Sequence, residues 1–119
     1  MTTQYQITVP VAGANGAAAG SATSTFPIYG ILVAVHLDHT TGAATADVTI
    51  TVGSPSQTVL TVTDSTTDAW YYPQVQIHTT AGAAISAQYM PPQVCGYVTV
   101  TVAQSNAGSV VASLLVVEG

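Results

Sequence analysis

Histidine and aspartate side chains in the run HLDH are the residues of this chain whose types could bind a metal ion or transfer a proton. His36 and Asp38 stand two residues apart, His39 follows at once, and His78 lies further along the chain. In an extended strand His36 and Asp38 point to the same side, about 6.5 to 7 Å apart along the chain. If His78 lay close to them in space, two imidazoles and a carboxylate could ligate a transition metal.

Two other interpretations compete with metal binding at these residues. A histidine at an interface between proteins can act as a pH-sensitive contact. A strand that leaves the core also becomes polar at its end, without any further role for the polar side chains. We predict no metal and no cofactor, and we keep His36, Asp38 and His78 as candidates for an interface.

The sequence carries no recognisable motif for nucleophilic or phosphoryl-transfer catalysis. Serine and threonine are abundant, but no G-x-S-x-G elbow occurs. A Walker loop needs a lysine, which the chain lacks, and GANGAAAG does not have the G-x-G-x-x-G spacing. Asp64 and Asp68 flank the turn TDSTTDAW, where aspartate commonly accepts hydrogen bonds from backbone N–H groups. We therefore predict that the protein is not an enzyme.

The one tryptophan of the chain stands beside two tyrosines and a proline, in the run TDAWYYPQ. After the turn a new extended segment begins, in which Trp70 and Tyr72 face one side and Tyr71 the other. One side is expected to enter the core, with Trp70 or Tyr71 as the anchor. Exposed rings beside Pro73 are typical of contact hot spots, and also of platforms on which sugars stack. We predict Trp70, Tyr71 and Tyr72 as interface residues.

Lysine and arginine are absent, and the five acidic residues give a formal net charge of −5. Charged residues make up 4% of the chain, whereas they make up roughly 25% of typical soluble domains. Proteins that bind nucleic acid or anionic membranes depend on lysine and arginine for their affinity. We therefore predict neither nucleic acid nor a membrane as a partner. Weak electrostatic repulsion between copies favours a protein that works in an assembly.

Neither a signal peptide nor a membrane span is expected from the sequence. MTTQYQITVPV lacks a cationic start and a continuous apolar region. The longest apolar run, IYGILVAVHL, is shorter than the roughly 18 to 20 residues of a membrane helix. The single cysteine, Cys95, allows no internal disulfide and is expected to be a small buried side chain.

Apolar patterning predicts an all-β protein. ATADVTITV and YVTVTVA alternate apolar residues with threonine or aspartate, as half-buried strands do, and TVLTVT is a third such run. FPIYGILVAVHLD and GSVVASLLVVE are apolar on both faces, which predicts strands buried on both sides. YQITVPV adds an N-terminal strand that Pro10 ends. About six to eight short, mostly antiparallel strands in a single domain favour a β-sandwich or a barrel.

Turn chemistry separates these runs. HTTGAA and GSPSQ contain the glycine, proline and serine that turns prefer. QSNAG predicts a hairpin loop between the last two strands.

Two segments depart from the strand pattern. AGANGAAAGSATST, residues 12–25, contains three glycines and is predicted to be flexible or extended. This divides the chain into an N-terminal strand with an Ala/Gly-rich arm, residues 1–25, and a β body, residues 26–119. YYPQVQIHTTAGAAISAQYMPPQV, residues 71–94, is a long, weakly patterned excursion, and such a loop in a compact domain is usually functional.

The order of these features resembles small all-β structural proteins of tailed bacteriophages and prophages, which look like capsid decoration (cement) proteins. In that group a strand, a TD-x-x-TD turn, a WYYP motif and a histidine recur in this order. Here they are Thr63–Asp64, Thr67–Asp68, Trp70–Pro73 and His78. The resemblance covers roughly residues 28–117, from the central strand to the terminus LLVVE. This chain has Gln74 where the family pattern often has a basic residue, so a salt bridge there is excluded.

The resemblance implies a virion structural protein on the outer surface of an icosahedral capsid, often a homotrimer at three-fold positions. Its partners would be further copies of itself and the major capsid protein, whose lattice it would stabilise. The segment Met1 to Ala22 would contact the capsid or a neighbouring copy. The alternatives are another head or tail component, or a receptor- or glycan-binding module of a tail fibre or secreted protein, with Trp70 and Tyr72 as the platform.

Overall fold

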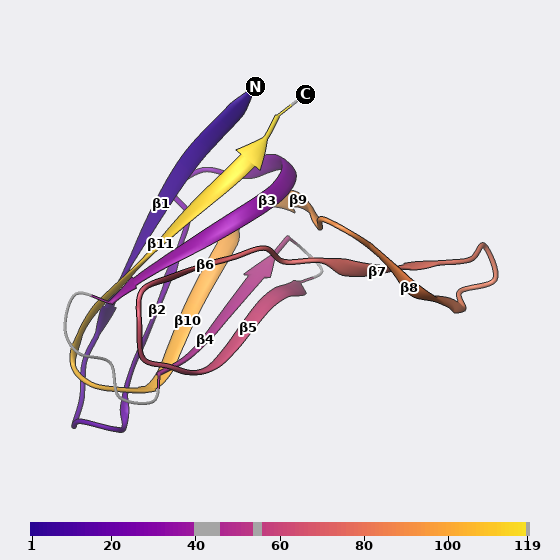
Figure 1. The fold of residues 1–119 in the computed structure, drawn as a ribbon. Coiled ribbons are helices and arrows are strands. Elements are labelled where there is room, and N and C mark those ends of the chain that lie inside the picture. The colour runs from indigo at the N-terminus through magenta and orange to yellow at the C-terminus, as the bar shows by residue number, and fades with distance from the viewer. Residues whose placement is uncertain (40–45, 54–55, 119) are drawn as a thin grey trace.

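A computed structural model describes residues 1–39, 46–53 and 56–118. These residues form eleven strands and no helix, and each pairing between strands is antiparallel. Two sheets lie face to face, and the two termini lie at the same end of the molecule (Figure 1). The predicted all-β class and the single-domain sandwich or barrel are confirmed, with more strands than expected.

The first sheet is built around the long strand β3 (Ile28–His39). On one edge β3 pairs with β11 (Gly108–Val117), which pairs in turn with β1 (Thr2–Val11). Two short strands share the other edge of β3: β6 (Ala69–Tyr71) pairs with its second half, and β9 (Gln93–Gly96) with its first. Strand β3 therefore has partners on both edges along most of its length.

The second sheet contains four strands. Their order is β2 (Ala18–Thr23), β10 (Val98–Ser105), β4 (Ala46–Val52) and β5 (Gln57–Ser65). The turn after β5 leads directly into β6 of the first sheet, so the chain itself links the sheets on that side.

A close backbone junction joins the two sheets on the opposite side. Ala12, just after β1, and Ala19 in β2 exchange two backbone hydrogen bonds, of 3.2 and 3.0 Å. Gly20 is required beside this junction, because a Cβ there would overlap the carbonyl oxygen of Pro10. Small residues in this stretch therefore allow β1 and β2 to approach closely.

The core lies between the sheets and follows the period of two that strands impose. In β4 the apolar side chains are buried, whereas the residues between them are partly exposed. Valine and isoleucine suit these positions because β-branched side chains pack well on a pleated surface. Both sheets contribute to the largest fully buried side chains, which include Ile28, Leu32, Leu37, Ile50, Leu114 and Val100.

The outer face of the second sheet is rich in threonine. Thr99 in β10 lies between Thr23 and Thr51, and Thr101 lies opposite Thr49. The hydroxyl oxygens of Thr23 and Thr99 are 3.0 Å apart and form a hydrogen bond. Threonine combines good strand propensity with a hydroxyl group that binds water, so this face suits contact with solvent.

The outer face of the first sheet is polar along β1, where Gln4, Gln6 and Thr8 are exposed, but it is apolar along the first half of β3. The prediction that β3 is buried on both sides is therefore wrong for the single chain. The outward side chains of Tyr29, Ile31 and Val33 are 58%, 39% and 38% exposed. In β11, which was predicted to be doubly buried too, Val117 is 37% exposed. The core covers one face of these strands, and no other described segment covers the second.

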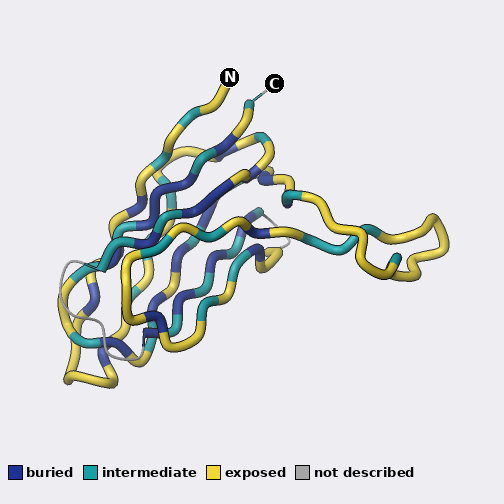
Figure 2. Tube along the Cα trace, viewed as in Figure 1, coloured by how far each residue is buried: buried dark blue, intermediate teal, exposed yellow. Residues whose placement is uncertain are grey.

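A two-stranded hairpin projects from the sandwich. Strands β7 (Val75–His78) and β8 (Ala84–Met90) pair with each other and with no other described strand. The hairpin extends away from the edge of β3 (Figure 1), and most of it is exposed (Figure 2). We call residues 72–92 the hairpin arm. The long excursion that the sequence predicts is therefore present, and it contains a hairpin.

The N-terminal residues belong to the sandwich, contrary to the predicted arm within residues 1–25. Strand β1 pairs with β11, and β2 pairs with β10. The side chains of Ile7, Val9, Val11 and Ala18 are buried in the common core. Residues 1–25 and 26–119 are thus not separate units, because an Ala/Gly-rich segment can pair through its backbone without a strong apolar pattern.

The predicted turns have different outcomes. QSNAG does not form a hairpin, because β10 and β11 belong to different sheets and the run carries the chain between them. The turns in HTTGAA and GSPSQ fall largely on residues 40–45 and 54–55, which lie outside the described residues.

The packing of the core predicts a large loss of stability for Ile50→Ala. Ile50 is fully buried, and truncation of such a side chain typically costs about 2 to 5 kcal/mol, because a cavity remains. Urea unfolding should show this decrease in the free energy of unfolding. The control Thr61→Val, on the exposed side of β5, should change it by less than about 0.5 kcal/mol. Equal losses in the two variants would contradict the assigned core.

Candidate interaction surface

Strand β6 positions the aromatic triplet at the edge of the first sheet. Its register places Tyr71 opposite Val35 and Trp70 opposite His36. Tyr71 packs against the core, whereas Trp70 and Tyr72 are 48% and 67% exposed. The predicted alternation of the three rings is confirmed, and Tyr71 is the ring that anchors the segment.

The outward ring of Trp70 rests on His36. The two ring centroids are 4.9 Å apart, and the ring planes are tilted by 53°. Cross-strand partners on one face of a sheet hold aromatic rings within reach of each other, and tilted contacts are among the geometries that such pairs prefer. His36 therefore orients the indole while about half of it stays exposed. The structure brings these two predicted residues together, and their role in an interface stays a prediction.

Apolar side chains continue along β3 beyond Trp70. Tyr29, Ile31 and Val33 are exposed, whereas Ile28, Leu32 and Ala34 of the same strand are buried, so the three exposed side chains point away from the core. Val117 in β11 lies opposite Ile31. A contiguous exposed apolar surface marks an interaction site, whereas single exposed apolar residues are normal. We call this surface the apolar face and define it as Tyr29, Ile31, Val33, Trp70 and Val117.

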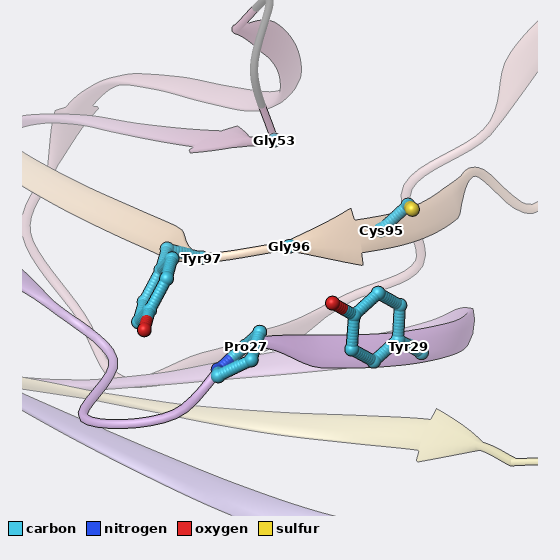
Figure 3. Close-up of a pocket in the computed structure, with 6 residues that line it drawn as sticks. All are labelled: Pro27, Tyr29, Gly53, Cys95, Gly96 and Tyr97. Carbon is cyan, nitrogen blue, oxygen red and sulfur yellow. The ribbon is translucent and has the colours of Figure 1, made fainter.

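An open pocket of about 420 Å³ lies beside Tyr29 at one end of the apolar face. Tyr29 from β3 and Tyr97, just after β9, stand on either side of Pro27 (Figure 3). Both tyrosines are more than half exposed. Backbone closes the pocket on another side, because a Cβ on Gly96 would lie only 3.3 Å from the Cα of Gly53. None of the lining residues is charged: they are Pro27, Tyr29, Gly53, Cys95, Gly96 and Tyr97.

Sequence reasoning missed this pocket and misplaced Cys95. Tyr29 was assigned to a strand buried on both sides, so its exposure was not expected. Cys95 is exposed rather than buried, because Val94 occupies the inward position in β9 and strand alternation turns the next residue outward. Alternation in the run VCGY was the available signal, since burial of Val94 places Cys95 and Tyr97 on the outer side.

His39 ends β3 in a partly buried environment. Its Nε2 lies 2.7 Å from Oγ of Ser65, and its backbone N–H donates to Oδ1 of Asp68 at 2.8 Å. Nδ1 is buried and has no hydrogen-bond partner in the described structure. Burial lowers the pKa of the imidazole below its usual value, and the nearby carboxylates of Asp68 and Asp38 only partly oppose this. Protonation would place an N–H at Nδ1 without an acceptor, which agrees with the lowered pKa.

The three residues of the hypothetical metal site do not gather around an ion. His78 is an exposed residue of the hairpin arm, whereas His36 and Asp38 lie in β3. Among the described residues, no three histidine, cysteine or acidic side chains cluster closely enough to hold a metal ion. The structure therefore offers no support for two imidazoles and a carboxylate as a single site.

Acidic side chains elsewhere hold the chain's own polar groups. Oδ1 of Asp47 accepts a hydrogen bond from the backbone N–H of Asp64 at 3.1 Å. The carboxylate of Glu118 accepts hydrogen bonds from the hydroxyl groups of Thr3 and Tyr5. The bond to Glu118 raises the pKa of the Tyr5 hydroxyl. These contacts tie the two termini and two strands together, which is a structural role.

No protein-family model, curated protein or solved structure matches the chain. No helix long and apolar enough to cross a membrane occurs in the part of the chain that the structure describes. Inference about function therefore begins from the geometry of the apolar face, the pocket and the hairpin arm, together with the resemblance of the sequence.

The environment of His39 predicts that the protein becomes less stable as the pH falls from about 7.5 to about 5.5. Because the folded pKa is below 6.5, the unfolded chain binds a proton in this window that the folded chain does not. The contribution of His39 is complete above the unfolded pKa and is lost towards the folded pKa. Thermal unfolding at a series of pH values measures the slope.

The variant His39→Gln should reduce this pH dependence. His78→Gln is the matched control, because His78 is exposed on the hairpin arm and should leave the slope as in the wild type. A slope that His39→Gln does not change would contradict the assigned origin.

Proposed function

We propose that the chain is a structural protein of a bacteriophage virion that binds the outside of the head as a capsid decoration protein. The resemblance of its WYYP segment and flanking strands motivates the proposal. The observation that carries it is the apolar face, an uncharged and partly aromatic surface on a sandwich with a complete core of its own. A surface of this kind favours lasting contact with another protein surface.

The proposed action is mechanical. Each bound copy would add contact area between neighbouring major capsid proteins. The decoration protein would bind the assembled lattice and not its dissociated subunits, so mass action would stabilise the lattice. Copies would associate around a symmetry axis, as a homotrimer. The absence of lysine and arginine suits a position outside the shell, where the protein meets no DNA.

The sequence predicts that residues 1–22 contact the capsid, and the fold restricts this contact to one loop. Strands β1 and β2 contribute to the core, so residues 1–22 cannot reach a partner as a free arm. The loop between them, residues 12–17, is exposed at the end of the sandwich opposite the termini (Figure 1). We infer that this loop contacts the capsid, and that deletion of residues 1–22 would unfold the protein.

Head binding tests the proposed function directly. Purified protein should sediment with expanded, undecorated heads, assembled from the major capsid protein of the phage or prophage genome that carries its gene. Decorated heads should also resist disruption to a higher temperature than bare heads, because binding stabilises the bound state. Heads that sediment without the protein at micromolar concentrations would exclude the decoration role.

A pair of charge variants tests the loop in the same experiment. Ala14→Glu, in the exposed loop, should weaken head binding about tenfold or more, which corresponds to about 1.4 kcal/mol. Thr61→Glu adds the same charge on the threonine-rich face and should bind as the wild type does. Equal binding by the two variants would place the capsid contact elsewhere on the molecule.

A receptor- or glycan-binding module is the second candidate, and the pocket between Tyr29 and Tyr97 favours it. Exposed aromatic rings beside backbone groups could stack on a neutral sugar without any charged side chain. Titration with a panel of neutral oligosaccharides, followed by NMR, should then shift signals of the pocket residues. Tyr97→Ala should abolish binding, whereas Tyr89→Ala, on the hairpin arm, should not. Failure of every sugar to bind at millimolar concentration would exclude this candidate.

A further inference from the structure

We propose that the hairpin arm of one copy packs on the apolar face of a second copy, so that each subunit holds its neighbour. The inference does not depend on the virion role. It specifies a surface and a partner, namely residues 72–92 of one chain against Tyr29, Ile31, Val33, Trp70 and Val117 of another.

The arm lacks the support that a hairpin needs in water. A two-stranded hairpin alone is marginally stable, and stability requires a third strand or packing against another element. The register pairs Val75 with Met90 and Gln76 with Tyr89, so large side chains lie on both sides of the arm. Met90 is 47% exposed and Tyr89 is 55% exposed. Pro73 and Pro92 at the base of the arm are buried, but β7 and β8 pair with no other described strand.

No described segment of the chain covers the apolar face. Its residue types differ from those on the other outward surfaces of the sandwich. The outer face of the second sheet is rich in threonine, and β1 of the first sheet exposes Gln4, Gln6 and Thr8. The part of the first sheet around the first half of β3 presents tyrosine, isoleucine, valine and tryptophan instead. Polar side chains thus cover other outward surfaces of the same sandwich, whereas the first half of β3 has none. We therefore infer that this part of the first sheet contacts protein.

The two surfaces match in charge. From residue 69 to residue 117 the sequence contains no aspartate, glutamate, lysine or arginine, and this range includes the whole arm. None of the five residues of the apolar face is charged. The arm could therefore cover the face without burying an unpaired charge, which would cost a large amount of free energy. A partner surface of ordinary composition would bring charged groups against this face.

The arm leaves the edge of β3 in a direction that suits contact with a neighbouring copy. Tyr71 in β6 lies opposite Val35 and Gln93 in β9 lies opposite Ile31, so the arm leaves from between two strands that share one edge of β3. From there it runs outward, away from its own sandwich (Figures 1 and 2). Contacts between the arm of one copy and the face of the next can repeat around a symmetry axis and close into a ring. With residues 72–92, the arm approaches the roughly 20 to 30 residues that one side of a standard interface engages.

The same register defines a clean arm deletion. The residues of β3 between the two strands are Leu32, Val33 and Ala34, and the backbone N–H of Leu32 already donates to the carbonyl of Pro92 at 3.0 Å. Replacing residues 73–91 with one glycine leaves Tyr72, the glycine and Pro92 to span these three positions. Strands β6 and β9 would become one continuous edge strand, and the sandwich should remain folded.

Light scattering behind a sizing column is the test. The wild type at about 100 µM should elute at a multiple of 12.0 kDa, and the arm deletion should elute as a monomer. Two single substitutions should also weaken association at least tenfold: Tyr89→Lys in the arm and Ile31→Lys in the apolar face. Thr61→Lys, at an exposed position of β5 outside both the arm and the apolar face, is the matched control and should keep the wild-type mass.

Hydrogen exchange gives a second readout that does not require the deletion variant to fold. Amide protons of β7 and β8 should exchange slowly in the wild-type oligomer and at least tenfold faster in Ile31→Lys, whose substitution lies outside the arm. Core amides of β4 should exchange alike in both proteins. A purely local effect of the substitution would not reach the arm.

The outcomes separate this inference from the decoration role. A monomeric wild type at the highest concentration, or an oligomer that survives both the arm and the face substitutions, would overturn the arm contact. A monomer that still binds heads would leave the decoration role standing alone. An arm-dependent oligomer that binds no heads would support the arm contact and exclude the decoration role.

Discussion

Strand β3 is held on both edges, and its pairing register determines where each candidate surface lies. The register with β6 places Tyr71 inside and Trp70 outside, over His36. A slip of one residue would exchange these faces, because neighbouring side chains of a strand point in opposite directions. The register with β11 has an irregularity beside Val33, near the point where the arm leaves the opposite edge. Core, aromatic rings and arm therefore depend on the same strand.

The scarcity of charge has different consequences on the two sides of the sandwich. On the second sheet, threonine hydroxyl groups replace charged side chains as the groups that bind water, and some of them bind each other. On the first sheet glutamine and threonine do the same along β1, but the outward residues of β3 from Tyr29 to Val33 and Val117 of β11 are apolar. None of the five acidic side chains belongs to the apolar face or to the arm, so no charged group of either surface opposes their association. Composition and sheet geometry thus both favour contact through the first sheet.

Much of the fold could be predicted from the sequence because strand alternation is a local property. The strands β4 and β10 and the opposite orientation of Tyr71 and Trp70 follow from a period of two. Sheet membership is not local, which is why QSNAG was taken for a hairpin although its two strands pair elsewhere. Residues 18–23 were missed for a related reason: Gly20 and its small neighbours form strand β2 through backbone contact, which leaves no apolar period to detect.

The strands predicted to be buried on both sides show what an apolar pattern cannot predict. A run that is apolar on both faces indicates burial on both faces, but it does not say whether the cover belongs to the same chain. For β3 the inner cover is intramolecular, and the sequence gives Ile31 and Val33 no different appearance from Leu32. The hairpin arm is the opposite case. Its strands do not pack in the core of their own sandwich, so they need not show the apolar alternation that core strands show. Both departures from the sequence pattern occur at the edge of β3, where one intermolecular contact would account for them together.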